Sequence, residues 1–154
     1  MWLILLQGFH VFFAVMWFGG DMFSNFVVVP AANQLDADHS NAFFAKYGKK
    51  VDGFMMPMGA LTIITGILLG FPLGAWNNIG HRYGNTYLAA FILAALVYLF
   101  GLLFLRRNIN KAMTHEQGSP EFVTIMGKVK MYGSLIVIGF LAIFVLMVAL
   151  RYGY

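Results

Sequence analysis

Long apolar stretches separated by short polar segments make up most of the chain, and their lengths predict four membrane-spanning helices. A helix rises about 1.5 Å per residue and the hydrocarbon core is about 30 Å thick, so about 20 apolar residues cross a bilayer once. The stretches of this length are residues 2–29, 51–73, 86–105 and 131–150. The pattern therefore predicts an all-α integral membrane four-helix bundle, with residues 1–154 as a single transmembrane domain.

Local signals refine the ends of these helices. Pro57 removes one backbone donor, so we expect it to kink the second span in its first turns. Ser119, Pro120 and Glu121 have the order of an N-cap, a first-position proline and an acidic first turn, which predicts that the fourth helix begins ahead of its apolar part. The polar residues 31–50 are expected to be partly helical.

Composition excludes several classes of protein. Only 10% of the 154 residues are charged and 60% are hydrophobic, whereas soluble domains are roughly a quarter charged, so a soluble enzyme is excluded. The chain has no cysteine, which excludes disulfides, iron–sulfur clusters and covalently attached c-type haem. The formal net charge is +4, but the basic residues lie beside the spans, so we expect no nucleic acid partner.

The distribution of basic residues predicts how the chain lies in the membrane. Eight of the ten Lys and Arg residues follow the first and third spans, and two follow the second and fourth. The eight are Lys46, Lys49, Lys50, Arg106, Arg107, Lys111, Lys128 and Lys130, and the two are Arg82 and Arg151. By the positive-inside rule, we expect both termini on the outer side of a bacterial inner membrane.

The first span carries its polar residues on one face. At about 100° per residue, the stripe within roughly 60° of His10 includes Gln7, Ala14, Trp17, Asp21, Ser24 and Asn25. An ionisable side chain inside a bilayer is costly and usually faces the bundle interior. Small residues of the second span, Gly66, Gly70 and Gly74, also allow close approach by a second copy, so a homo-oligomer is compatible with the sequence.

Two interpretations of His10 remain open. It is a neutral histidine that bonds a Ser, Thr or Tyr on a facing helix, or it is an axial ligand to a haem between the helices. His81, at the outer end of the third span, is the candidate second metal ligand, although it should lie nearer the interface. Asp21 is interpreted either as a proton-path carboxylate or as the partner of Lys46, Lys49 or Arg106.

Two short blocks resemble a known family. His10, Trp17, Phe18, Gly19 and Gly20 are similar to the first span of HemJ-type membrane protoporphyrinogen oxidases and related CopD-like membrane proteins. Met55, Met56, Pro57, Leu61, Thr62 and Gly66 are similar to the start of the second span in the HemJ group. Together these blocks cover the first half of the chain.

The resemblance implies a four-helix bundle that binds b-type haem. His10 would be the axial ligand, Trp17 and Pro57 would line the pocket, and Thr62 would belong to the same cofactor site. HemJ proteins carry a lysine early in the third span, and this span has none, so the resemblance implies haem binding more than porphyrinogen oxidation.

Three functions follow as expectations. The first is electron transfer or a haem-linked oxidation, with quinone as a partner; whether a substrate is turned over stays open. The second is copper handling by His10, His81 and methionine sulfur, which suits soft Cu(I). The third is a cofactor-free subunit whose polar stripe packs against another chain of a membrane complex.

Overall fold

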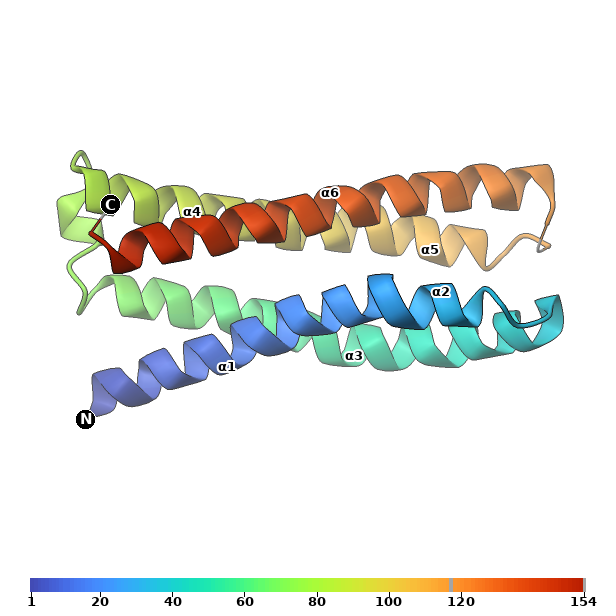
Figure 1. The fold of residues 1–154 in the computed structure, drawn as a ribbon, viewed down its shortest axis with the longest axis horizontal. Coiled ribbons are helices and arrows are strands. Elements are labelled where there is room, and N and C mark those ends of the chain that lie inside the picture. Colours follow the sequence, from blue (N-terminus) through green and yellow to red (C-terminus); the bar gives the residue numbers. More distant parts are fainter. Residues whose placement is uncertain (117, 154) are drawn as a thin grey trace.

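The protein, described here by a computed structural model, is all-helical in the part of the chain that the structure covers. That part comprises residues 1–116 and 118–153, without the side chains of residues 37, 38 and 41. Four helical rods run side by side along the length of the molecule (Figure 1). Each is long and apolar enough to cross a membrane. The predicted all-α class is thereby confirmed, and four helices able to span a membrane lie where the four spans were expected.

The first and third rods are each built of three consecutive helical segments. The first contains α1 (Trp2–Phe23), the π-helical turn η1 (Ser24–Val28) and α2 (Val29–Ala32), and the third contains α4 (Arg82–Phe100), the π-helical turn η3 (Gly101–Leu105) and α5 (Arg106–Ala112). The second and fourth rods are the single helices α3 (Ala37–Gly70) and α6 (Pro120–Arg151), and the short 3-10 helix η2 (Trp76–Asn78) lies between α3 and α4.

Capping residues place the helix starts well outside the apolar stretches. The side chain of Asp36 accepts a hydrogen bond from the backbone N–H of His39 at 3.1 Å, and α3 therefore begins 14 residues before the expected position 51. The hydroxyl oxygen of Ser119 accepts from the N–H of Phe122 at 3.2 Å. This cap confirms the predicted early start of the fourth helix. Pro57 consequently lies inside the long helix α3 rather than in its first turns.

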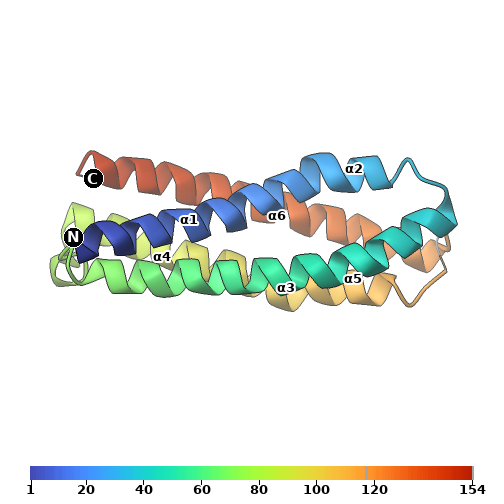
Figure 2. The ribbon, with the colours of Figure 1, turned by 90° about the horizontal axis from the view of Figure 1, so that it is seen from below.

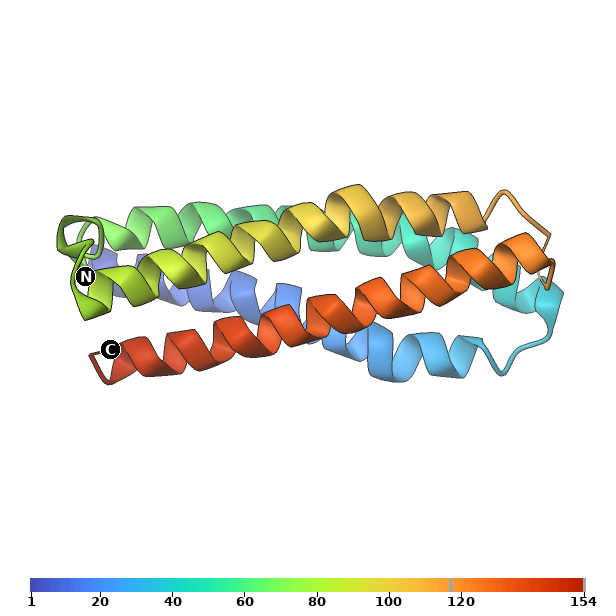
Figure 3. The same cartoon turned by 90° about the horizontal axis from the view of Figure 1, so that it is seen from above.

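The helices pack in chain order around the bundle. The α1 rod lies along α3, and α4 lies along α6, with α3 against α4 and α1 against α6 closing the bundle (Figures 2 and 3). Both termini lie at one end, together with the connection between α3 and α4 (Figure 1). We call this the terminal end. The connections between α2 and α3 and between α5 and α6 lie at the opposite end, which we call the loop end.

A layer of close packing near the middle of the molecule involves all four rods. Its members, which we call the Trp17 layer, are Trp17 of α1, Gly59 of α3, Val97 and Tyr98 of α4, and Ile136 and Phe140 of α6. The ring centroid of Trp17 lies 4.8 Å from that of Phe140 and 5.9 Å from that of Tyr98, both edge to face. Aromatic pairs in this geometry add packing energy beyond the area they bury.

The two π-helical turns lie against the same part of α6. A side chain at Gly133 would meet the Oδ1 atom of Asn25 in η1 at 3.1 Å, and a side chain at Gly101 in η3 would meet Ile136 at 3.6 Å. Gly133 and Ile136 are less than one helical turn apart. Such single π turns within α-helices are frequent at functional sites.

Candidate functional site

His10 lies on the face of α1 that packs against α3, on the terminal-end side of the Trp17 layer. Its Nδ1 atom is 3.0 Å from the carbonyl oxygen of Thr62 and 3.0 Å from the hydroxyl oxygen of Thr65. The ring lies flat enough against α3 that a side chain at Gly66 would meet its Cε1 atom at 3.2 Å. The imidazole is therefore fixed by the second span.

These contacts settle which ring nitrogen carries the proton. A carbonyl oxygen only accepts hydrogen bonds, so Nδ1 must be the donor to Thr62. The Thr65 hydroxyl already donates to the carbonyl of Leu61 at 2.6 Å, so its oxygen is also free to accept from Nδ1. In a neutral imidazole the other nitrogen, Nε2, then carries a lone pair and no proton.

The second ring nitrogen of His10, Nε2, accepts no hydrogen bond from the described residues, and it is not fully covered by protein. Histidines that bind metals commonly donate their second N–H to a backbone carbonyl, which fixes the ring and leaves the other nitrogen as the ligand. His10 has this arrangement, with the Thr62 carbonyl as the fixing group.

Tyr87 extends the polar group to the third span. Its hydroxyl donates to the carbonyl of Gly66 at 2.6 Å, and its ring packs edge to face on Trp76 at 5.3 Å. We call His10, Thr62, Thr65 and Tyr87 the His10 cluster. Sequence reasoning placed Thr62 in the site but missed Thr65 and Tyr87. The signal for Thr65 was its position one turn beyond Thr62, which puts both hydroxyls on one helix face.

Two residues expected in the same pocket lie elsewhere. Trp17 is buried in the layer that bears its name, seven residues or about 10 Å along α1 from His10. Pro57 is exposed on α3, five residues before Thr62. Pro57 is thus no part of the His10 cluster, and Trp17 belongs to the packed layer in the middle of the bundle.

His81 does not join His10. It is the N-cap residue of α4, exposed, and makes no side-chain capping bond. Tyr87 lies at the depth of His10, because its hydroxyl bonds the Gly66 carbonyl beside the His10 ring. The six steps along the helix from His81 to Tyr87 correspond to about 9 Å. The mismatch in depth expected from the sequence is therefore present, and His81 stands near the end of the bundle.

Met55, a methionine of the second span, is also remote from His10. It packs against Gly20, which is ten residues or about 15 Å along α1 from His10. Within the described ranges, no group of three His, Asp or Glu side chains is placed to hold a metal ion. His10, His81 and Met55 do not form one coordination site.

Asp21 is not paired with Arg106, as one interpretation held. The guanidinium of Arg106 binds Asp52 on α3 at 2.8 Å instead. Asp21 accepts a hydrogen bond from the side-chain amide of Asn25 at 3.1 Å, and in the described part of the chain it forms no ion pair with a lysine. An ion pair between an aspartate and Arg106 was one expectation from the sequence. It forms with Asp52 and not with Asp21, because Asp52 is nearer to the third span.

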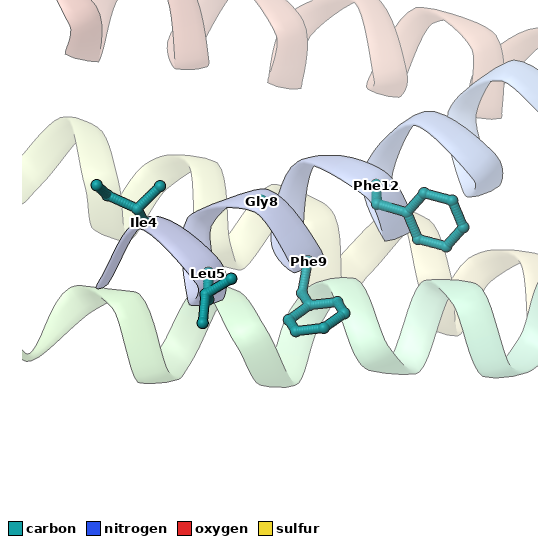
Figure 4. Close-up of a pocket in the computed structure, with 5 residues that line it drawn as sticks. All are labelled: Ile4, Leu5, Gly8, Phe9 and Phe12. Carbon is teal, nitrogen blue, oxygen red and sulfur yellow. The ribbon is translucent and has the colours of Figure 1, made fainter. Parts of the chain in front are cut away.

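An open groove runs along the exposed side of α1 near the N-terminus (Figure 4). It is lined by Ile4, Leu5, Gly8, Phe9 and Phe12. None of these side chains offers a nitrogen, oxygen or sulfur atom to a metal or a polar ligand, so the groove adds no chemistry to the His10 cluster.

The described residues would offer a haem iron one nitrogen ligand, the Nε2 atom of His10. His10 supplies a fixed ring with an unprotonated Nε2, and no second histidine of the described chain lies at its depth. Comparisons with family models, curated proteins and solved structures give no match to this chain.

Proposed function

We propose that this chain is a b-type haem-binding protein of the bacterial inner membrane that acts in electron transfer or a haem-linked oxidation, with quinone as its partner. The proposal rests on the different hydrogen bonding of the two ring nitrogens of His10. Nδ1 donates to the Thr62 carbonyl, and Nε2 is left with a lone pair and no donor. The resemblance of the first two spans to HemJ-type proteins supports the same assignment.

Two residues of α3 would hold His10 in place as the ligand. The Thr62 carbonyl and the Thr65 hydroxyl orient the ring and keep its proton on Nδ1, so that the lone pair of Nε2 would be available to a metal. A haem bound through Nε2 would supply one-electron chemistry, and the burial and hydrogen bonding of its ligand would tune the reduction potential.

The orientation is part of the proposal. The eight basic residues that follow the first and third spans lie toward the loop end, and the rule of positive residues inside puts that end in the cytoplasm. The His10 cluster would then lie in the outer half of the membrane.

A cofactor-free subunit is the second candidate, because one observation favours it. The bond between His10 Nδ1 and Thr65 is also what a histidine that only packs two helices together would form. The copper alternative has no such support, since its ligands lie at different depths.

Optical spectroscopy of the purified protein separates these candidates. The protein is expressed with added haem precursor, purified in mild detergent and scanned before and after reduction. A Soret band with α and β bands that sharpen on reduction supports haem. Protein that carries no haem after this supply, and binds none when haemin is added, contradicts the proposal and leaves the packing subunit.

Substitutions then identify the ligand. His10→Ala is expected to abolish the haem spectrum, because no other described histidine reaches this depth. His81→Ala is the matched control and is expected to leave the spectrum unchanged. Thr65→Val keeps the shape of the side chain but removes an acceptor from Nδ1, so we expect haem to be retained with an altered midpoint potential. An unchanged spectrum in His10→Ala would remove His10 from its role.

A further inference from the structure

The interior of the bundle contains two polar groups on opposite sides of the Trp17 layer. The His10 cluster lies toward the terminal end. Toward the loop end, Asp21 bonds Asn25, and the hydroxyls of Ser24 and Tyr47 lie 2.7 Å apart. We call these four residues the Asp21 cluster. His10 and Asp21 lie on one face of α1, 11 residues or about 16 Å apart.

The Trp17 layer fills the space between the two clusters. Trp17, Ile136 and Phe140 are each less than a tenth exposed. At Gly59 not even a methyl group fits, since it would lie 2.7 Å from a ring atom of Tyr98 and 3.0 Å from one of Trp17. Close-packed apolar layers of this kind hold no water.

The side-chain hydroxyls next to the Trp17 layer donate hydrogen bonds to backbone carbonyls. The Tyr98 hydroxyl donates to the carbonyl of Met56 at 3.4 Å, toward the loop end, and the Thr62 hydroxyl donates to the carbonyl of Met58 at 2.7 Å. Among the described residues, no hydrogen bond joins a member of the His10 cluster to a member of the Asp21 cluster. A proton or a polar molecule therefore finds no relay through the layer.

We propose that the Trp17 layer seals the bundle, so that protons and polar ligands do not pass between the His10 cluster and the loop end. The inference rests on the proposed function where it names the ligand: for a haem site, a polar redox partner does not reach the haem from the loop end. The seal itself depends only on the packing of the four rods.

The absence of cysteine from the sequence makes this directly measurable. Single-cysteine variants of the full-length chain, embedded in sealed membrane vesicles of both orientations, are treated with a small, charged, membrane-impermeant thiosulfonate. His10→Cys reports on the His10 cluster and Asn25→Cys on the Asp21 cluster. Ile79→Cys and Glu116→Cys, exposed near the terminal and loop ends, identify which end each vesicle presents.

The seal predicts no labelling of the His10→Cys variant from the loop end, and none of the Asn25→Cys variant from the terminal end. Labelling of His10→Cys from the loop end overturns the seal. The labelling needs no haem, so a negative optical spectrum together with the labelling pattern of a sealed layer would separate the two proposals.

Removal of the central ring provides a second measurement. In the His10→Cys background, Trp17→Ala is expected to permit labelling from the loop end, because it takes out the side chain that contacts both Tyr98 and Phe140. Phe12→Ala removes an exposed ring of the same helix and is the matched control. Equal protection from the loop end in both double variants would contradict the assignment of the seal to this layer.

Discussion

Gly59 is the position where the packing of the four rods can be tested most directly. An added Cβ would lie 2.7 Å from Tyr98 Cδ2 and 3.0 Å from Trp17 Cε2, whereas carbon atoms in contact normally lie about 3.5–4.0 Å apart. The Tyr98 ring would have to retreat by about 0.8 Å to restore ordinary contact. The Trp17 ring cannot move away from the added methyl group, because its centroid lies 4.8 Å from that of the Phe140 ring.

Gly59→Ala is therefore expected to destabilise the protein. Overpacking a close-packed core costs about 1–3 kcal/mol, while replacing glycine by alanine inside a helix gains at most about 1 kcal/mol. Gly8→Ala and Gly19→Ala are matched controls on α1, since nothing lies within 4 Å of a Cβ at either position. Relative to these controls, we expect Gly59→Ala to lower the free energy of unfolding by about 2 kcal/mol.

The measurement is an equilibrium unfolding titration with sodium dodecyl sulfate in mixed micelles, followed by tryptophan fluorescence. A double variant adds a further check: with Tyr98→Ala present, the added methyl has space, so the cost of Gly59→Ala should fall well below its value in the native background. Equal stability of Gly59→Ala and the two controls would refute the packing described for the Trp17 layer.

Three further outcomes follow from single contacts. Tyr87→Phe removes the hydrogen bond to Gly66, and unfolding titrations should show a loss of about 0.6 kcal/mol, the average for such bonds between membrane helices; no loss would place the hydroxyl elsewhere. Gly84→Ala puts a side chain into the backbone of Asn78, and we expect faster proteolysis of the connection between α3 and α4, with unchanged cleavage counting against this contact. Ser119→Ala removes a helix cap and should cost about 1 kcal/mol, whereas Ser119→Asp should retain most of the stability.

The sequence predicts the rods of this fold well because its strongest signal is the length of each apolar stretch. It also places the start of α6, since the side chain of Ser119 and the ring of Pro120 act locally. The two π-helical turns were not predicted. Hydrophobic periodicity follows the α-helical repeat, and one extra residue in a turn changes the face of a helix without changing its composition.

From the sequence, the site could be predicted only where the spacing of residues within a single helix determines it. The stripe on α1 correctly turned His10 toward the bundle interior, because spacing alone determines which side chains share a face. Which partner it meets depends on how α3 is rotated and shifted against α1, and nothing local to either segment encodes that. Thr65 was therefore missed, and the partner of Arg106 was assigned to Asp21 in place of Asp52.

The π-helical turns have a mechanical consequence. Each accommodates one residue more than an α-helical turn would, so shifting that extra residue along the rod rotates the intervening stretch by about 100° while the rod stays continuous. Because η1 and η3 both contact the segment of α6 between Gly133 and Ile136, a rotation in either rod would act on that shared segment. This would add a second link between the first and third spans to the direct contact of Trp17 with Tyr98.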